Sequence, residues 1–117
     1  MAFTKKAQTF HRETGQRAAL LRSLARSLVL EERISTTEAK AKALRPFVER
    51  LVTYAKTNTL SSRRLADKRI HDKAAVKKLF DTIGPRYVDR KGGYTRIVKR
   101  TKRGLNDARK LAYIAFV

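Results

Sequence analysis

The residues of this chain that could do chemistry are mainly arginines and lysines, and they are densest over residues 86–103. Tyr87 and Tyr94 lie among them, together with the pair Gly92-Gly93. Arginine and lysine bind phosphates, arginine also stacks on bases, and glycine lets one backbone approach another closely. Basic residues interleaved with aromatic ones suit an RNA surface, where shape and exposed bases are read. The pattern predicts an RNA-binding segment, although a place in the core is an equally good interpretation of Tyr94.

Smaller basic clusters lie elsewhere in the chain. Arg22 and Arg26 are four residues apart and share one face of an expected helix, where two like charges slightly oppose helix formation unless an anion lies between them. A solvated helix face is the plainer interpretation of that pair. The full set of candidate RNA contacts is Lys5, Lys6, Arg12, Arg17, Arg22, Arg26, Arg63, Arg64, Arg69, Arg86, Arg90, Lys91, Gly92, Gly93, Tyr94, Arg96, Lys99, Arg100, Lys102 and Arg103.

The net charge of the chain favours a polyanionic partner. The 117 residues include 29 lysines and arginines but only 10 aspartates and glutamates, which gives a formal charge of +19. A compact domain with this excess repels itself unless something neutralises it, and a nucleic acid does so while releasing its condensed counterions. Both ends of the chain and residues 61–90 are strongly basic, so we expect contacts with the polyanion on several sides.

Enzymatic activity finds little support in these residues. His11 and His71 have no serine or aspartate partner in a recognisable motif, and the chain contains no cysteine. Gly92-Gly93 is too short for a dinucleotide-binding loop, and we expect a strand after it, not a helix. We therefore predict no catalytic residue, metal, cofactor or small-molecule substrate.

The apolar residues indicate a modest core and no membrane partner. Hydrophobic residues make up 42% of the chain. The longest apolar run, residues 111–117, is far too short to span a bilayer. The basic, mixed start of the chain does not resemble a secretory signal, so we expect none.

Hydrophobic periodicity predicts the elements that must position the basic residues. Apolar residues at helical spacing indicate helices over residues 15–30, 38–56, 60–68 and 73–83, and β-rich runs indicate strands over 94–99 and 111–117. Residues 33–37 could add a third strand. We predict an α+β fold with four to five helices on a two- to three-stranded sheet. Residues 1–13 are expected to be a basic extended N-terminal arm, and residues 14–117 a single RNA-binding domain.

Local signals refine these helix boundaries. Ser35, in a capping box with Glu38, and Thr37 are equally good N-caps for the second helix, and Asp72 is a good N-cap for the fourth. Pro46 lies inside the second helix, so we expect a kink or a break there. Gly84-Pro85 should end the fourth helix, with the glycine in the left-handed conformation.

Three classes of function compete at this point. They are a structural RNA-binding protein of a ribonucleoprotein, a nucleoid-type or helix-turn-helix DNA-binding protein, and an RNA-modifying enzyme or its accessory domain. The junction at Ile70-His71 could imitate a helix-turn-helix, but no dimer face for a palindromic site is visible. The enzyme class lacks a motif. Composition favours the first class without excluding the second.

Several runs of residues, in order and with nearly unchanged spacing, carry a family resemblance. They are AALLRSLARSLV at 18–29, ISTT at 34–37, AKAK at 39–42, LR at 44–45, LVTYAK at 51–56, RRLA at 63–66, VKKLF at 76–80, GPRY at 84–87, RKGGYTRI at 90–97 and AYI at 112–114. Over residues 9–117 the chain resembles the bacterial large-subunit ribosomal protein seventeen family. It departs from the family pattern at its start (MAFTKKAQT), in the loop at 104–107 and at Ala115, where glutamate is common.

The resemblance implies a function that composition alone does not specify. Members of that family have a compact α+β domain with a basic N-terminal extension, bind large-subunit ribosomal RNA and have no enzymatic activity. It therefore implies a cytoplasmic ribosomal protein that supports subunit assembly and translation. It also implies neighbouring ribosomal proteins near the polypeptide tunnel exit as partners.

Overall fold

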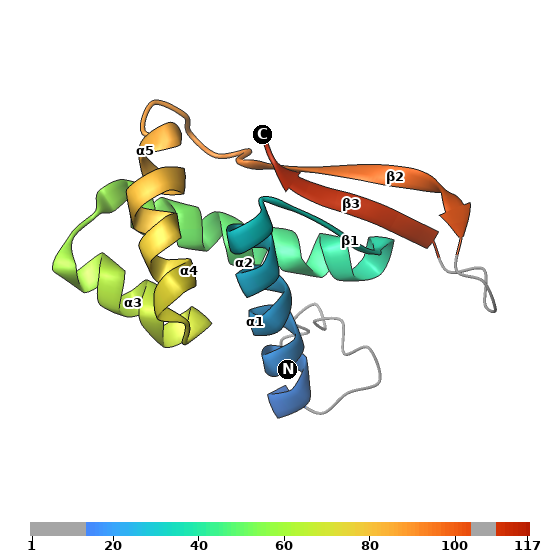
Figure 1. Cartoon of the computed structure of the whole chain (residues 1–117), viewed down its shortest axis with the longest axis horizontal. Coiled ribbons are helices and arrows are strands. Elements are labelled where there is room, and N and C mark those ends of the chain that lie inside the picture. Colours follow the sequence, from blue (N-terminus) through green and yellow to red (C-terminus); the bar gives the residue numbers. More distant parts are fainter. Residues whose placement is uncertain (1–13, 104–109) are drawn as a thin grey trace, which may run out of the picture.

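The computed structural model describes residues 14–103 and 110–117. In chain order the elements are α1 (Thr14–Glu31), β1 (Arg33–Thr37), α2 (Glu38–Thr57), α3 (Leu60–Ile70), α4 (Lys73–Lys78), a π-helical turn (Leu79–Ile83), α5 (Gly84–Arg86), β2 (Thr95–Arg103) and β3 (Lys110–Phe116). The labelled helices gather on one side of the strands, with α2 running beneath the sheet (Figure 1). This arrangement confirms the predicted α+β class and the small sheet.

The sheet has the strand order β1-β3-β2, and both pairings are antiparallel. The predicted third strand at residues 33–37 is therefore confirmed. Strand β3, the most apolar of the three, occupies the centre, where both of its edges are hydrogen-bonded. Its buried residues alternate with partly exposed ones, so one face of the sheet packs on the helices and the other faces solvent.

Helix α2 forms the middle of the core. Its apolar stripe is completely or almost completely buried and packs against the other helices and the sheet. The burial of that stripe follows from its spacing of three and four residues, which places the side chains on one face. The buried residues of the stripe are Ala41, Leu44, Val48, Leu51, Val52 and Ala55.

Two predicted helix caps are confirmed. The Thr37 hydroxyl accepts a hydrogen bond from the Lys40 backbone N–H at 3.3 Å and starts α2. The Asp72 carboxylate accepts hydrogen bonds from the N–H groups of Ala74 and Ala75, at 3.0 and 3.2 Å, and starts α4. Each bond satisfies a donor that the first helical turn would otherwise leave without a partner.

Helix α2 continues through the exposed Pro46, so the proline does not break it into two helices. The glycine signal acts differently from the prediction. Gly84 has φ −55° and is helical, so it does not form the left-handed end that we expected. A Cβ atom at Gly84 would lie 2.8 Å from the Cβ and carbonyl oxygen of Ala55. Gly84 is therefore required for close packing on α2, and the chain stays helical up to Arg86.

Candidate nucleic-acid interface

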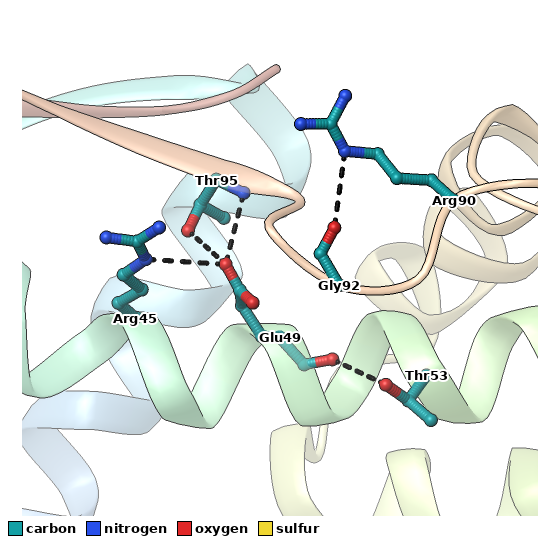
Figure 2. A network of polar contacts seen from close by, with 6 residues as sticks. All are labelled: Arg45, Glu49, Thr53, Arg90, Gly92 and Thr95. Atoms are coloured by element: carbon teal, nitrogen blue, oxygen red, sulfur yellow. Dashed lines mark hydrogen bonds and ion pairs between the residues drawn. The ribbon is translucent and has the colours of Figure 1, made fainter.

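The start of strand β2 is fixed to helix α2 by one carboxylate. Oε2 of Glu49 accepts hydrogen bonds from both the backbone N–H and the hydroxyl of Thr95, at 3.2 and 2.9 Å (Figure 2). The same oxygen lies 3.4 Å from Nε of Arg45. Thr95 is almost fully buried, so these bonds set where the strand leaves the core. Strand β2 therefore presents its basic residues from a fixed origin.

The turn before β2 is built on a buried tyrosine. Tyr94 is 4% exposed, and its hydroxyl accepts a hydrogen bond from Nζ of Lys56 at 2.8 Å. The hydrogen bond from Lys56 lowers the pKa of Tyr94, because it favours the phenolate. Lys56 also donates to the carbonyl of Arg90, so it ties the turn to α2. The structure places Tyr94 in the core, where it supports the turn and offers no ring face to solvent.

The glycine pair shapes the exposed part of this turn. Gly92 and Gly93 have φ values of +92° and +64°, which side-chain-bearing residues rarely adopt. Nε of Arg90 donates to the carbonyl of Gly92 at 3.2 Å (Figure 2). The side chains of Arg90 and Lys91 are exposed. We define these four residues, 90–93, as the basic turn.

The solvent-facing side of the sheet brings together arginines that are distant in sequence. Ala115 of β3 pairs with Arg33 of β1 on one side and with Arg96 of β2 on the other. Paired residues of antiparallel strands project to the same face, so the two arginines flank Ala115 on that face. Arg33 and Arg96 are exposed, whereas Arg100, farther along β2, is half-buried.

Arg86 is held by an ion pair. Its Nη1 lies 2.6 Å from Oε1 of Glu32, and Nζ of Lys78 lies 3.4 Å from Oε2 of the same glutamate. The hydrogen bond from Arg86 lowers the pKa of Glu32, and the same bond raises the pKa of Arg86. Glu32 thus connects the end of α1 to α4 and α5. Arg86 is only partly available to another anion.

The two arginines of α1 donate to the carboxyl end of α3. Nε of Arg26 donates to the carbonyl of Ile70 at 2.8 Å, and its Nη2 donates to that of His71 at 3.3 Å. Nε of Arg22 donates to the carbonyl of Arg69 at 3.3 Å. These carbonyls have no partner within their own helix. The pair therefore joins two helices, a role that the four-residue spacing did not indicate.

The remaining predicted contacts are scattered over the helices and the sheet. Nη2 of Arg63 lies 3.4 Å from Oδ1 of Asp81, and Nζ of Lys99 lies 3.6 Å from Oε1 of Glu38. Arg64 is exposed, whereas Arg17 and Arg69 are half-buried. Lys5, Lys6 and Arg12, with the side chains of Lys102 and Arg103, lie outside the described residues.

Sequence reasoning missed several residues that build this surface. Glu49 and Lys56 hold β2 and the basic turn on α2, but nothing in the local sequence distinguishes them from other solvated charges on a helix. Arg33 and Tyr113 belong to the solvent-facing side of the sheet. Their positions in β-rich runs indicated strands, but only the pairing of those strands shows that the two residues are neighbours.

Two kinds of site are missing from the part of the chain described. Its histidines, aspartates and glutamates form no group of three that could hold a metal ion. None of its helices is both long and apolar enough to cross a membrane.

The fold is a small α+β domain with basic surfaces, and comparison with known proteins specifies the family. The model of the ribosomal protein L17 family matches residues 20–117. The chain is 55% identical over 112 residues to the large ribosomal subunit protein bL17 of Hydrogenobaculum sp. (strain Y04AAS1), covering 96% of this chain and 95% of that one. Over 117 residues it is 50% identical to the bL17 protein of Thermomicrobium roseum, covering 100% and 99%. The chain therefore belongs to the ribosomal protein L17 family.

This membership confirms the resemblance stated from the sequence and the predicted class of function. The chain is a structural ribosomal protein and not an enzyme. The DNA-binding alternative finds no support among these relatives, which are named as large-subunit ribosomal proteins.

Proposed function

We propose that the chain, as a structural constituent of the large ribosomal subunit in the cytoplasm, binds ribosomal RNA through the basic turn and strand β2. The observation that carries this proposal is that three cations of this surface are exposed and have no carboxylate partner in the described part of the chain. Arg90, Lys91 and Arg96 are exposed, and among the described residues none of them is in an ion pair. Cations without a carboxylate partner on a rigid support suit phosphate binding, because no ion pair has to be broken first.

The charge of the strands supports the same surface. Strands β1, β2 and β3 contain seven lysines and arginines and no aspartate or glutamate. The described carboxylates lie instead on the helices and in the segments that connect the elements. RNA approaching the sheet therefore meets attraction from every charged residue of the strands.

The other predicted contacts belong to the same proposal with less support. Arg64 and the arm residues Lys5, Lys6 and Arg12 extend the RNA contact beyond the sheet. Arg86 and Lys99 contact the RNA only where its phosphates displace their carboxylate partners, Glu32 and Glu38. The position near the tunnel exit, beside other ribosomal proteins, rests on the family resemblance. Protein–protein cross-linking on intact large subunits, followed by mass spectrometry, tests that position.

Sedimentation of the tagged full chain in a sucrose gradient tests the proposal as a whole. We expect the protein to sediment with the large subunit and with RNA extracted from it. The variant Arg90→Gln/Lys91→Gln should shift a substantial share of the protein to the top of the gradient. The control Arg50→Gln/Lys77→Gln removes the same charge from exposed positions on α2 and α4 and should leave sedimentation almost unchanged. Equal behaviour of the two variants would show that the basic turn is not the contact.

A further inference from the structure

A tyrosine lies between two guanidinium groups on the solvent-facing side of the sheet. The Cζ atom of Arg33 lies 4.0 Å from the centroid of the Tyr113 ring, and that of Arg100 lies 4.9 Å from it. Both distances are within the range of cation–π attraction. The three side chains come from three different strands, so the sheet must form before the cluster exists.

The strand register brings the two arginines to Tyr113 from opposite directions. Arg33 is paired with Ala115, two residues after Tyr113 on β3. Arg100 follows Lys99, which is paired with Ala112, so it lies on the other side of Tyr113 along that strand. Its Nη1 reaches Ser35 of β1 and donates to the hydroxyl at 2.9 Å. Arg100 thus crosses the central strand, and both guanidinium groups are held near one ring.

The cluster keeps its positive charge. Contact with an aromatic ring orients a guanidinium group but leaves most of its N–H donors free. Among the described residues, neither Arg33 nor Arg100 is in an ion pair with a carboxylate. Two such groups repel each other, and a shared anion would reverse that repulsion. The preferred geometry of arginine with an anion is a two-pronged contact with phosphate or carboxylate oxygens.

We propose that Arg33 and Arg100, positioned by Tyr113, form a clamp for the phosphates of an RNA strand on the solvent-facing side of the sheet. This proposal rests on the proposed function and extends the contact on strand β2 across the sheet to Arg33 of β1. Arg96, on the same face, extends the line of charge beside Ala115. Val98, paired with Tyr113 and 49% exposed, offers apolar contact to a ribose or base.

Charge complementarity selects RNA over a protein as the occupant. The neighbours of Tyr113 on this face are two arginines, Ser35, Ala115, Val98 and the partly exposed Leu111, so cations and small or polar residues separate the apolar side chains. A stable protein interface needs a larger apolar centre. A phosphate backbone needs only cations at suitable spacing, which this face supplies.

Binding of the full chain to transcribed large-subunit ribosomal RNA over a salt series tests the clamp. The variant Arg33→Gln/Arg100→Gln should weaken binding roughly tenfold or more and reduce the slope of log affinity against log salt by about 1.4 to 1.8, as expected for two lost phosphate contacts. The control Arg50→Gln/Lys77→Gln should change the slope much less. Equal changes in the two variants would overturn the clamp.

Substitution of the ring separates positioning from charge. Tyr113→Leu leaves the net charge unchanged but removes the support of both guanidinium groups, so we expect a several-fold loss of affinity. Tyr113→Phe should recover most of that loss, because the ring is retained. Circular dichroism and thermal melting check that both variants fold. A folded Tyr113→Leu variant with wild-type affinity would contradict the positioning role.

A photo-crosslinking amino acid at position 98 identifies the occupant directly. Val98 lies opposite Tyr113, so irradiation of the assembled subunit should join the protein to ribosomal RNA. A cross-link only to another protein would overturn the proposal. The two proposals fail separately: wild-type protein that does not bind the RNA contradicts the proposed function, whereas normal binding with an inert clamp contradicts only this inference.

Discussion

The arginines of helix α1 and those of the sheet have the same charge but opposite surroundings. Arg22 and Arg26 donate to backbone carbonyls at the end of α3, whereas Arg33 and Arg96 on the strands are exposed. A helix leaves its last carbonyls unpaired and slightly negative, so they attract nearby guanidinium groups. Carbonyls between paired strands are already used in the ladder. The difference teaches that secondary structure, as well as sequence, decides whether an arginine remains available to RNA.

The net charge of +19 therefore overstates the charge that faces RNA. Part of it holds helices together, and part is in ion pairs such as that between Arg86 and Glu32. Three cations of the basic turn and strand β2, Arg90, Lys91 and Arg96, are exposed and, among the described residues, are in no ion pair. The predictions below test this division between a structural and an RNA-binding set of arginines.

The largest expected effect is the response of RNA binding to salt. If roughly six to ten phosphates are neutralised, affinity for large-subunit ribosomal RNA should fall by about a thousandfold or more between 50 and 200 mM salt. Filter binding at several salt concentrations measures it. Variants of the sheet arginines should flatten the response, whereas Arg26→Gln should not. A nearly flat wild-type response would remove the electrostatic basis of both surfaces.

The next largest effect is the loss of folding stability that we expect on substitution of the helix arginines. Arg26→Ala removes two hydrogen bonds from a charged donor to backbone carbonyls, so we expect a loss of about 2 kcal/mol in the free energy of unfolding. Urea denaturation measures that loss, and Arg50→Ala, at an exposed position on α2, is the control. RNA affinity should stay near wild type wherever the variant is folded. A stable Arg26→Ala variant with weakened RNA binding would place Arg26 in the RNA-binding set.

Much of the fold was predictable from the sequence because its signals are local. The period of apolar residues located the four long helical segments, and Thr37 and Asp72 marked the starts of two of them. The class of the fold and the third strand followed from the same patterns. The prediction for Gly84 was wrong because a glycine is required there by close packing on Ala55, a residue far away in the sequence.

The candidate site was predictable only in part, because its geometry depends on contacts between distant residues. The segment at 86–103 was recognisable from its density of arginine and lysine. That Tyr94 is hydrogen-bonded to Lys56, and that Tyr113 lies between Arg33 and Arg100, depends on which elements pack together. Pairing distances of 38, 80 and 13 residues along the chain leave no local pattern that could reveal these contacts.

A smaller effect is expected from the basic turn. Gly93 has φ +64°, and a β-branched residue there strains the backbone, so Gly93→Val should cost about 1 to 2 kcal/mol of stability. We expect the free variant to relieve this strain by changing the shape of the turn that carries Arg90 and Lys91. RNA binding then has to restore the strained shape, so affinity should fall by roughly tenfold, which corresponds to about 1.4 kcal/mol. Gly93→Asn is the matched control, since asparagine tolerates this conformation. Normal RNA affinity in a folded Gly93→Val variant would mean that the turn does not need its present shape.

The smallest effect concerns Arg86, which lies between the two sets. Its hydrogen bond to Glu32 lowers the pKa of that glutamate in the folded protein. The ionised glutamate therefore stabilises the fold above the usual glutamate pKa, and this contribution is lost as the pH falls through the lowered value. Glu32→Gln should cost less than about 1 kcal/mol at neutral pH, because both partners are partly exposed.

The stability difference between wild type and Glu32→Gln should shrink as the pH falls through the acidic range, which thermal melts at several pH values can follow. Glu31→Gln is the control, since Glu31 is exposed and, among the described residues, forms no ion pair. The same Glu32→Gln change frees Arg86 and adds one net positive charge, so RNA affinity at neutral pH should rise slightly. A fall in RNA affinity with unchanged stability would instead mean that the ion pair orients Arg86 toward the RNA. Arg86 would then belong with the sheet arginines, and contact with a carboxylate would no longer separate the structural set from the RNA-binding set.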